Sequence, residues 1–233
     1  MSLYLHQFFF GIYPYICLTV FLLGSLVRFD RDQYTWKSDS SQLLRAGQLR
    51  WGSNLFHVGI LFLFLGHLVG LLTPHALYEP FISATAKQML AVISGGIAGV
   101  LCFAGLSMLL YRRLADPRIR LTSRRTDIFI LVILWIQVVL GLATLPSSYA
   151  HRADAHTMLV LASWVQHLFT LHPNPAALMT VDCVFKVHIA LGLTILLLFP
   201  FCRLVHVWSG LGTVSYLLRP YQLVRTRRLN LPR

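Results

Sequence analysis

The sequence predicts an all-α membrane protein, a polytopic bundle of five transmembrane helices with its N-terminus outside and its C-terminus inside. Of its 233 residues, 56% are hydrophobic and 12% are charged, and the mean hydropathy is +0.66. The apolar residues form runs of about 20, the length at which an α-helix crosses a bilayer. Basic residues gather in alternate connections between these runs, which sets the orientation. We expect residues 1–233 to form a single membrane domain.

The five predicted spans follow from these apolar runs. Residues 8–27 and 51–73 hold no acidic or basic side chain apart from histidine, and residues 88–111 and 128–145 hold none at all. The fifth span, 183–208, has Lys186 and Arg203 near its two ends, where long basic side chains can reach the membrane interface. Residues 209–233 then form a basic cytoplasmic tail.

The orientation depends on lysine and arginine, which collect in cytoplasmic loops. The connections after the first and third spans and the tail are rich in arginine, whereas the other side has Lys87, Arg152 and Lys186. We do not expect a cleaved signal peptide, because the first residues lack a positive n-region and a small-residue cleavage site. The basic connection at 28–50 and the tail are expected docking surfaces for a cytoplasmic partner.

A sixth uncharged segment, at 156–171, is too short and too polar to be predicted as a span. Gln166 and His167 interrupt it, Pro173 follows it, and a sixth crossing would put the basic tail outside. We predict an interfacial or loop helix on the outer side. Its neighbourhood holds four histidines that we expect at the surface, namely His151, His156, His167 and His172.

Several functional classes find no support in the sequence. The basic residues flank apolar spans and form no aromatic-interleaved stripe on a soluble fold, so nucleic acid is not an expected partner. No Walker loop, GxGxxG or HExxH motif is present. The cysteines form no CxxC or CxxCH, which favours packing roles over thiolate metal binding or covalent haem attachment. They are Cys17, Cys102, Cys183 and Cys202.

Four histidines lie within the second and fifth spans, at positions 57, 67, 188 and 206. An imidazole in a membrane helix is costly unless something holds it. Because the two spans run antiparallel, His67 is paired with His188 near the outer side and His57 with His206 near the inner side. The separations along the two helices are about 15 Å and about 27 Å, and we expect a kink at Pro200 to absorb the difference.

Two such pairs predict two haems, each with two axial imidazoles. Iron held at both axial positions has no open site for oxygen, which favours electron transfer. Gly66, Gly70 and Gly192 lie within a turn of the histidines and could leave room for a macrocycle, although ordinary helix packing is the better explanation of glycines alone. Two other functions stay open at this point: a histidine-lined proton or metal transporter, and a cofactor-free anchor for a soluble partner.

The chain also resembles the gamma subunit of membrane-bound respiratory nitrate reductase, a di-haem cytochrome b, over nearly its whole length. Several of the matching strings contain the four histidines. They are FFFGIYPYI at 8–16, QYTW at 33–36, SNLFHVGI at 53–60, GHLVGLLTPH at 66–75, VHIALG at 187–192, RLVHVWS at 203–209 and YQLVR at 221–225.

This resemblance implies a function in the bacterial inner membrane. It implies that quinol is oxidised near an outer haem b bound by His67 and His188. It also implies that electrons pass through an inner haem b, bound by His57 and His206, to an iron-sulfur beta subunit and a molybdenum-containing alpha subunit that reduces nitrate. No nitrate site is expected on this chain.

Two further site residues are predicted. The resemblance favours contact of Lys87 with the quinol, and Arg203 either pairs with a propionate of the inner haem or anchors the helix at the membrane surface. Arg112 and Arg113 have the same two interpretations. Residues 147–181 look unlike the family, and a related cytochrome b of sulfur metabolism is the alternative for the electron acceptor.

Overall fold

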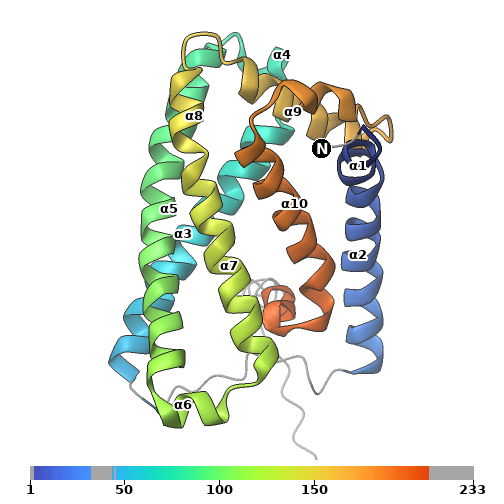
Figure 1. The fold of residues 1–233 in the computed structure, drawn as a ribbon. Helices are drawn as coiled ribbons and strands as arrows, with labels where there is room; N and C mark the ends of the chain where they lie inside the picture. Colours follow the sequence, from blue (N-terminus) through green and yellow to red (C-terminus); the bar gives the residue numbers. More distant parts are fainter. Residues whose placement is uncertain (1–2, 33–43, 45, 210–233) are drawn as a thin grey trace, which may run out of the picture.

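The computed structural model describes residues 3–32, 44 and 46–209, which are almost entirely helical (Figure 1). Five helical segments in this part of the chain are long and apolar enough to cross a membrane, which confirms the predicted fold class. The basic tail from 210 onward and residues 33–43 and 45 of the first connection lie outside the described residues, and so does most of the predicted docking surface. The five segments are Leu3–Arg31, Ala46–Leu72, Ala84–Ala115, Arg125–Ala150 and Cys183–Phe201.

The first segment consists of α1 (Leu3–Gln7), a π-helical turn (Phe8–Ile12) and α2 (Tyr13–Arg31). The next two long helices are α3 (Ala46–Leu72) and α5 (Ala84–Ala115), joined by the short α4 (His75–Tyr78). The fourth segment is α7 (Arg125–Ala143) with α8 (Leu145–Ala150), and α6 (Pro117–Thr122) precedes it. Helices α9 (His156–Phe169) and α10 (Cys183–Leu198) follow. The first four helical segments are longer than the predicted apolar spans because the helices continue into their polar ends.

The long helices pack in the order α3, α5, α7, α10 and α2. Helices α4, α8 and α9 lie at one end of the bundle together with the first described residues, and α6 lies at the other end (Figure 1). We call these the α9 end and the α6 end. Helix α3 runs toward the α9 end, whereas α10 runs toward the α6 end (Figure 1).

Helices α3 and α5 approach each other closely along a line of small residues. A Cβ atom on Gly59 would lie 2.6 Å from the backbone nitrogen of Cys102, and one on Gly105 would lie 2.7 Å from the carbonyl oxygen of Gly52. Cys102 is fully buried at this contact, with Leu106 beside it in the same apolar cluster. The predicted packing role of Cys102 is therefore confirmed, and the close contact fixes the position of α3.

Helix α9 is tied to the first segment by hydrogen bonds at the α9 end. Pro14 has no N–H, so the carbonyl of Phe10 cannot receive the usual helical bond. Trp164 of α9 donates its indole N–H to that carbonyl at 3.0 Å, and the Tyr15 hydroxyl donates to the carbonyl of Leu168 at 3.1 Å. Helix α9 is not among the five membrane-length segments, as predicted.

The four histidines expected at the surface near α9 are all exposed. His6 is buried, and its Nε2 lies 2.7 Å from the carbonyl oxygen of Pro175. Gln166 of α9 donates to the carbonyls of Leu71 and Thr73, at 3.0 Å and 3.4 Å. Helix α9 thus also supplies partners for the C-terminal carbonyls of α3.

The fifth predicted span, 183–208, is wrong as a single helix. Helix α10 ends at Leu198, and a short 3-10 turn follows at Phe199–Phe201. Cys202 is extended, with φ −130° and ψ −178°, before a second 3-10 turn at Arg203–Val205. The chain is therefore broken rather than kinked beyond Pro200.

Two residues of α2 contact the chain at this break. Arg28 donates from Nη1 to the carbonyl oxygens of Pro200 and Cys202, at 2.7 Å and 2.9 Å. A Cβ atom on Gly24, one turn earlier, would lie 2.8 Å from Cγ of Pro200. The broken backbone needs partners for its carbonyls in an apolar surrounding, and Arg28 provides them. From the sequence, Arg28 is expected only as part of the basic connection that sets the orientation and offers a docking surface.

Candidate functional site

Two pairs of histidine rings face each other between α3 and the fifth segment. The ring centroids of His67 and His188 are 6.3 Å apart toward the α9 end, and those of His57 and His206 are 6.4 Å apart toward the α6 end. The structure brings together the same two pairs that helix depth predicts. His188 lies within α10, whereas His206 lies beyond the break.

The separations fit one metal ion held between each pair. A metal–imidazole bond is about 2 Å long, and the ring centre lies roughly 1 Å behind the coordinating nitrogen, so two opposed imidazoles have centroids about 6 Å apart. Within the described residues, no group of three or more His, Cys, Asp or Glu side chains gathers as a metal site. This arrangement fits a metal ion that takes two ligands from the protein and the rest from another group, such as a porphyrin.

Hydrogen bonds orient three of the four rings. The Nδ1 atoms of His57, His67 and His206 each lie 2.7 Å from a backbone carbonyl oxygen, on Ser53, Leu63 and Arg203. A carbonyl can only accept, so Nδ1 carries the proton and Nε2 keeps its lone pair. This is the arrangement by which proteins fix an imidazole for metal binding.

His188 is the exception. Its Nδ1 is buried and has no hydrogen-bond partner in the part of the chain that the structure describes, and its backbone carbonyl accepts a bond from Nε2 of Gln137 on α7 at 3.1 Å. A Cβ atom on Gly141 would lie 3.1 Å from Cε1 of His188, so α7 packs directly against this ring. Sequence reasoning missed Gln137, although an amide in the middle of an apolar span is a signal that could have identified it.

Two of the three glycines near the histidines leave space beside α3. A Cβ atom on Gly66 or Gly70 would meet no atom within 4 Å, and His57 and His67 on the same helix are exposed. Gly192 differs, because a Cβ atom there would lie 3.1 Å from Nε2 of Gln137. Gly66 and Gly70 are therefore compatible with a flat group next to α3, and Gly192 serves packing.

Lys87 lies near the His67–His188 pair. Its Nζ donates to the carbonyl of Gly70 at 3.1 Å and stands 3.7 Å from the ring centroid of Tyr78. Gly70 lies three residues after His67, on the next turn of α3. Burial, aided by the Glu79 carboxylate, raises the pKa of the Tyr78 phenol, so this ring stays neutral beneath the ammonium group.

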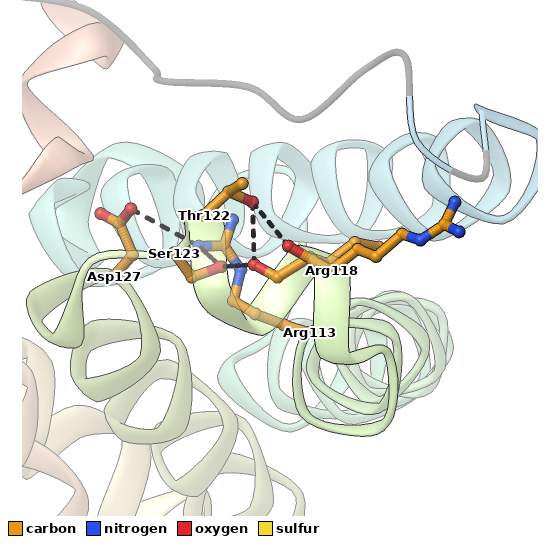
Figure 2. A network of polar contacts seen from close by, with 6 residues as sticks. Arg113, Arg118, Thr122, Ser123 and Asp127 are labelled. Carbon is orange, nitrogen blue, oxygen red and sulfur yellow. Dashed lines mark hydrogen bonds and ion pairs between the residues drawn. The ribbon is translucent and has the colours of Figure 1, made fainter.

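Figure 2 shows a polar network at the α6 end, between α5 and the start of α7. The Nη1 atom of Arg113 lies 3.4 Å from Oδ2 of Asp127 and 3.3 Å from Oγ of Ser123, and both ion-pair side chains are largely buried. Asp127 stands in the first turn of α7, where its charge also favours the helix dipole. Arg113 therefore has a protein partner in this network.

The other predicted arginines lie close by. Arg112 is buried and donates from Nη2 to the carbonyl of Leu44 at 2.5 Å. Arg203 lies in the 3-10 turn after Cys202, and its backbone carbonyl is the acceptor for His206. Arg203 thus contributes to the orientation of the His206 ring through its backbone, a role that its side-chain type did not predict.

Comparison with known proteins identifies the family. A family model described as nitrate reductase gamma subunit matches residues 6–227, a range that includes the segment 147–181. The chain is 50% identical to the respiratory nitrate reductase 2 gamma chain of Escherichia coli (strain K12), over 98% of this chain and 100% of that protein. It is 48% identical to the respiratory nitrate reductase 1 gamma chain of the same organism, over 96% and 99%. A third relative, the nitrate reductase gamma chain of Bacillus subtilis (strain 168), is 37% identical over 95% and 98%. The chain belongs to the nitrate reductase gamma subunit family.

Proposed function

We propose that this chain is the cytochrome b subunit that oxidises quinol and delivers the electrons to the subunits that reduce nitrate. The observation that carries this proposal is the pair of opposed imidazoles at each of two depths, 6.3 Å and 6.4 Å apart. Family membership supports a place in a nitrate reductase complex, with an iron-sulfur beta subunit and a molybdenum-containing alpha subunit as partners.

The four histidines would hold two haem b groups, His67 and His188 the outer one and His57 and His206 the inner one. Bound haem with two imidazoles supplies one-electron transfer and leaves no coordination position for oxygen. The backbone carbonyls of Ser53, Leu63 and Arg203 hold three of the ligands in the tautomer that directs Nε2 to the metal. Arg203 also has a side chain that would pair with a propionate of the inner haem.

The distribution of charge supports an orientation with the α6 end in the cytoplasm of a bacterial inner membrane. Around α6 the chain carries Arg112, Arg113 and four further arginines up to position 125, whereas the α9 end has Lys87, Arg152 and Lys186. Basic residues favour the cytoplasmic side. Quinol oxidation at the α9 end would release its protons outside while electrons move inward, which would charge the membrane.

Lys87 would bind the quinol oxygen. An ammonium group has three donor hydrogens, and the carbonyl of Gly70 takes one of them. The ring of Tyr78 and this carbonyl fix the ammonium group one turn from His67. A quinol hydroxyl held there would be close to the outer pair. Its oxygen would accept a hydrogen bond that strengthens as negative charge develops on loss of the proton.

We expect Lys87→Met to lower kcat/KM for quinol by about 10–100-fold, because a hydrogen bond from a charged group contributes about 1.5–3 kcal/mol. The measurement is quinol-dependent nitrate reduction by the purified complex in detergent. Arg152→Gln is a matched control, since Arg152 also donates to a carbonyl and stacks on a tyrosine ring at the α9 end. Equal effects of the two substitutions would assign Lys87 an anchoring role instead.

The haem content of the purified complex tests the proposed function. Dithionite reduction should give a b-type spectrum with two haems per copy of this chain, the stoichiometry set by four axial imidazoles. Mild-detergent purification should also yield the iron-sulfur and molybdenum subunits. A colourless preparation that binds zinc would support a transporter, and a colourless one without metal would support an anchor. Co-purification with subunits of sulfur metabolism instead would show that the terminal electron acceptor is not nitrate.

A further inference from the structure

Two buried polar atoms on neighbouring helices have no hydrogen-bond partner among the described residues. One is Nδ1 of His188 on α10, and the other is Oε1 of Gln137 on α7. Nδ1 of a metal-binding imidazole is a donor and an amide oxygen is an acceptor. The two groups are therefore complementary in chemistry, and each lacks what the other offers. Buried polar atoms without partners are rare and call for an explanation.

The packing of α7 on α10 keeps the two side chains together. Gln137 already donates from Nε2 to the backbone carbonyl of His188 at 3.1 Å. Gly141, one turn after Gln137, lies against the imidazole, and a Cβ atom there would be 3.7 Å from Nδ1. Gly192, one turn after His188, lies against the amide, and its Cβ atom would be 3.1 Å from Nε2 of Gln137. The absence of side chains at both glycines lets the amide and the ring share one space.

We propose that Gln137 is a positioning residue for His188, accepting a hydrogen bond from Nδ1–H through its amide oxygen when Nε2 of His188 binds the outer haem. The terminal torsion of glutamine is soft, so the amide can turn Oε1 toward the ring. This inference rests on the proposed haem-binding role of His188. It gives the fourth ligand the same kind of partner that backbone carbonyls give the other three.

The consequence is a tuning role at the outer haem. An acceptor on Nδ1 fixes the tautomer and makes the imidazole more basic, which stabilises the oxidised iron and lowers the reduction potential. The other three acceptors are backbone carbonyls that substitution cannot remove. Gln137 is a side chain, so the potential of the outer haem depends on one replaceable residue.

Redox titration of the whole complex tests this role with two substitutions. Gln137→Met keeps the volume but removes both polar atoms, and we expect the outer haem potential to rise while the inner one stays unchanged. Gln137→Glu keeps an acceptor oxygen in either protonation state, and we expect a potential equal to that of the unmodified protein or lower. Ser107→Ala is the control, because it removes a different hydrogen bond of α7, the one from Trp135 at 2.9 Å.

Two outcomes would overturn the proposal. One is an unchanged reduction potential of the outer haem in Gln137→Met. The other is an equal shift of that potential in Gln137→Met and Gln137→Glu, which would mean that only the hydrogen bond donated by Nε2 of Gln137 matters. Should Gln137→Met fail to assemble, Gly192→Ala displaces the amide while retaining every polar atom, and a shift confined to the outer haem is again expected. A complex with no haem ligated by His188 would instead contradict the proposed function.

Discussion

Replacing His67 or His188 with alanine should remove the haem at the α9 end and leave the one at the α6 end in place. Among these four histidines, each ring faces one partner, with centroids 6.3 Å apart for His67 and His188 and 6.4 Å apart for His57 and His206. A site with one of its two imidazoles removed would no longer supply both protein ligands that the haem needs. We expect the haem content to fall from two to one per chain, and quinol-driven nitrate reduction to fall to background.

The complementary substitutions, His57→Ala and His206→Ala, should remove the inner haem and spare the outer one. Reduced-minus-oxidised spectra and redox titration distinguish the two centres. Nitrate reduction driven by an artificial donor to the partner subunits controls for assembly of the complex. His167→Ala is a matched control, because His167 also bonds through Nδ1 to the carbonyl four residues earlier, at 2.7 Å, but stands on α9 and belongs to neither pair. Loss of both haems from every one of the four substitutions would refute the assignment of separate pairs.

The second large effect is expected at the contact between α3 and α5. Gly105→Ala would place a Cβ atom 2.7 Å from the carbonyl oxygen of Gly52 and 2.8 Å from Cα of Phe56. These are backbone atoms, so the clash cannot be relieved by rotating a side chain. Overpacking of this kind costs about 1–3 kcal/mol and sometimes more. We expect a clearly lower midpoint of thermal unfolding in detergent.

Because α3 carries His57 and His67, a shift of this helix should weaken both haem sites together, unlike the substitutions of single ligands. Gly95→Ala is the control on α5, the helix that carries Gly105, since a Cβ atom at Gly95 would meet nothing within 4 Å. Unfolding followed by haem absorbance and by size-exclusion chromatography measures the difference. Equal midpoints for the two variants would show that α3 and α5 can separate at little cost.

The pairing of the histidines could be predicted from the sequence because depth in a membrane is nearly a linear function of position along a helix. His57 and His67 fall at two levels of one span, and antiparallel order then selects His206 and His188. The prediction for the fifth span failed in its geometry. A kink was expected at Pro200, whereas α10 ends at Leu198 and Cys202 is extended.

The amino-acid sequence is enough to predict the membrane-length helices, their order, and the four histidines that face one another in pairs. Apolar runs and helical rise are local properties, so they can be read along one chain. Three long-range contacts are visible only in the packed bundle. Arg28 binds the broken backbone after α10, Trp164 binds the carbonyl of Phe10, and Gln137 lies against His188. Each of these depends on a polar group finding a partner from a distant segment in an apolar surrounding, and only the packed bundle determines which partner is near.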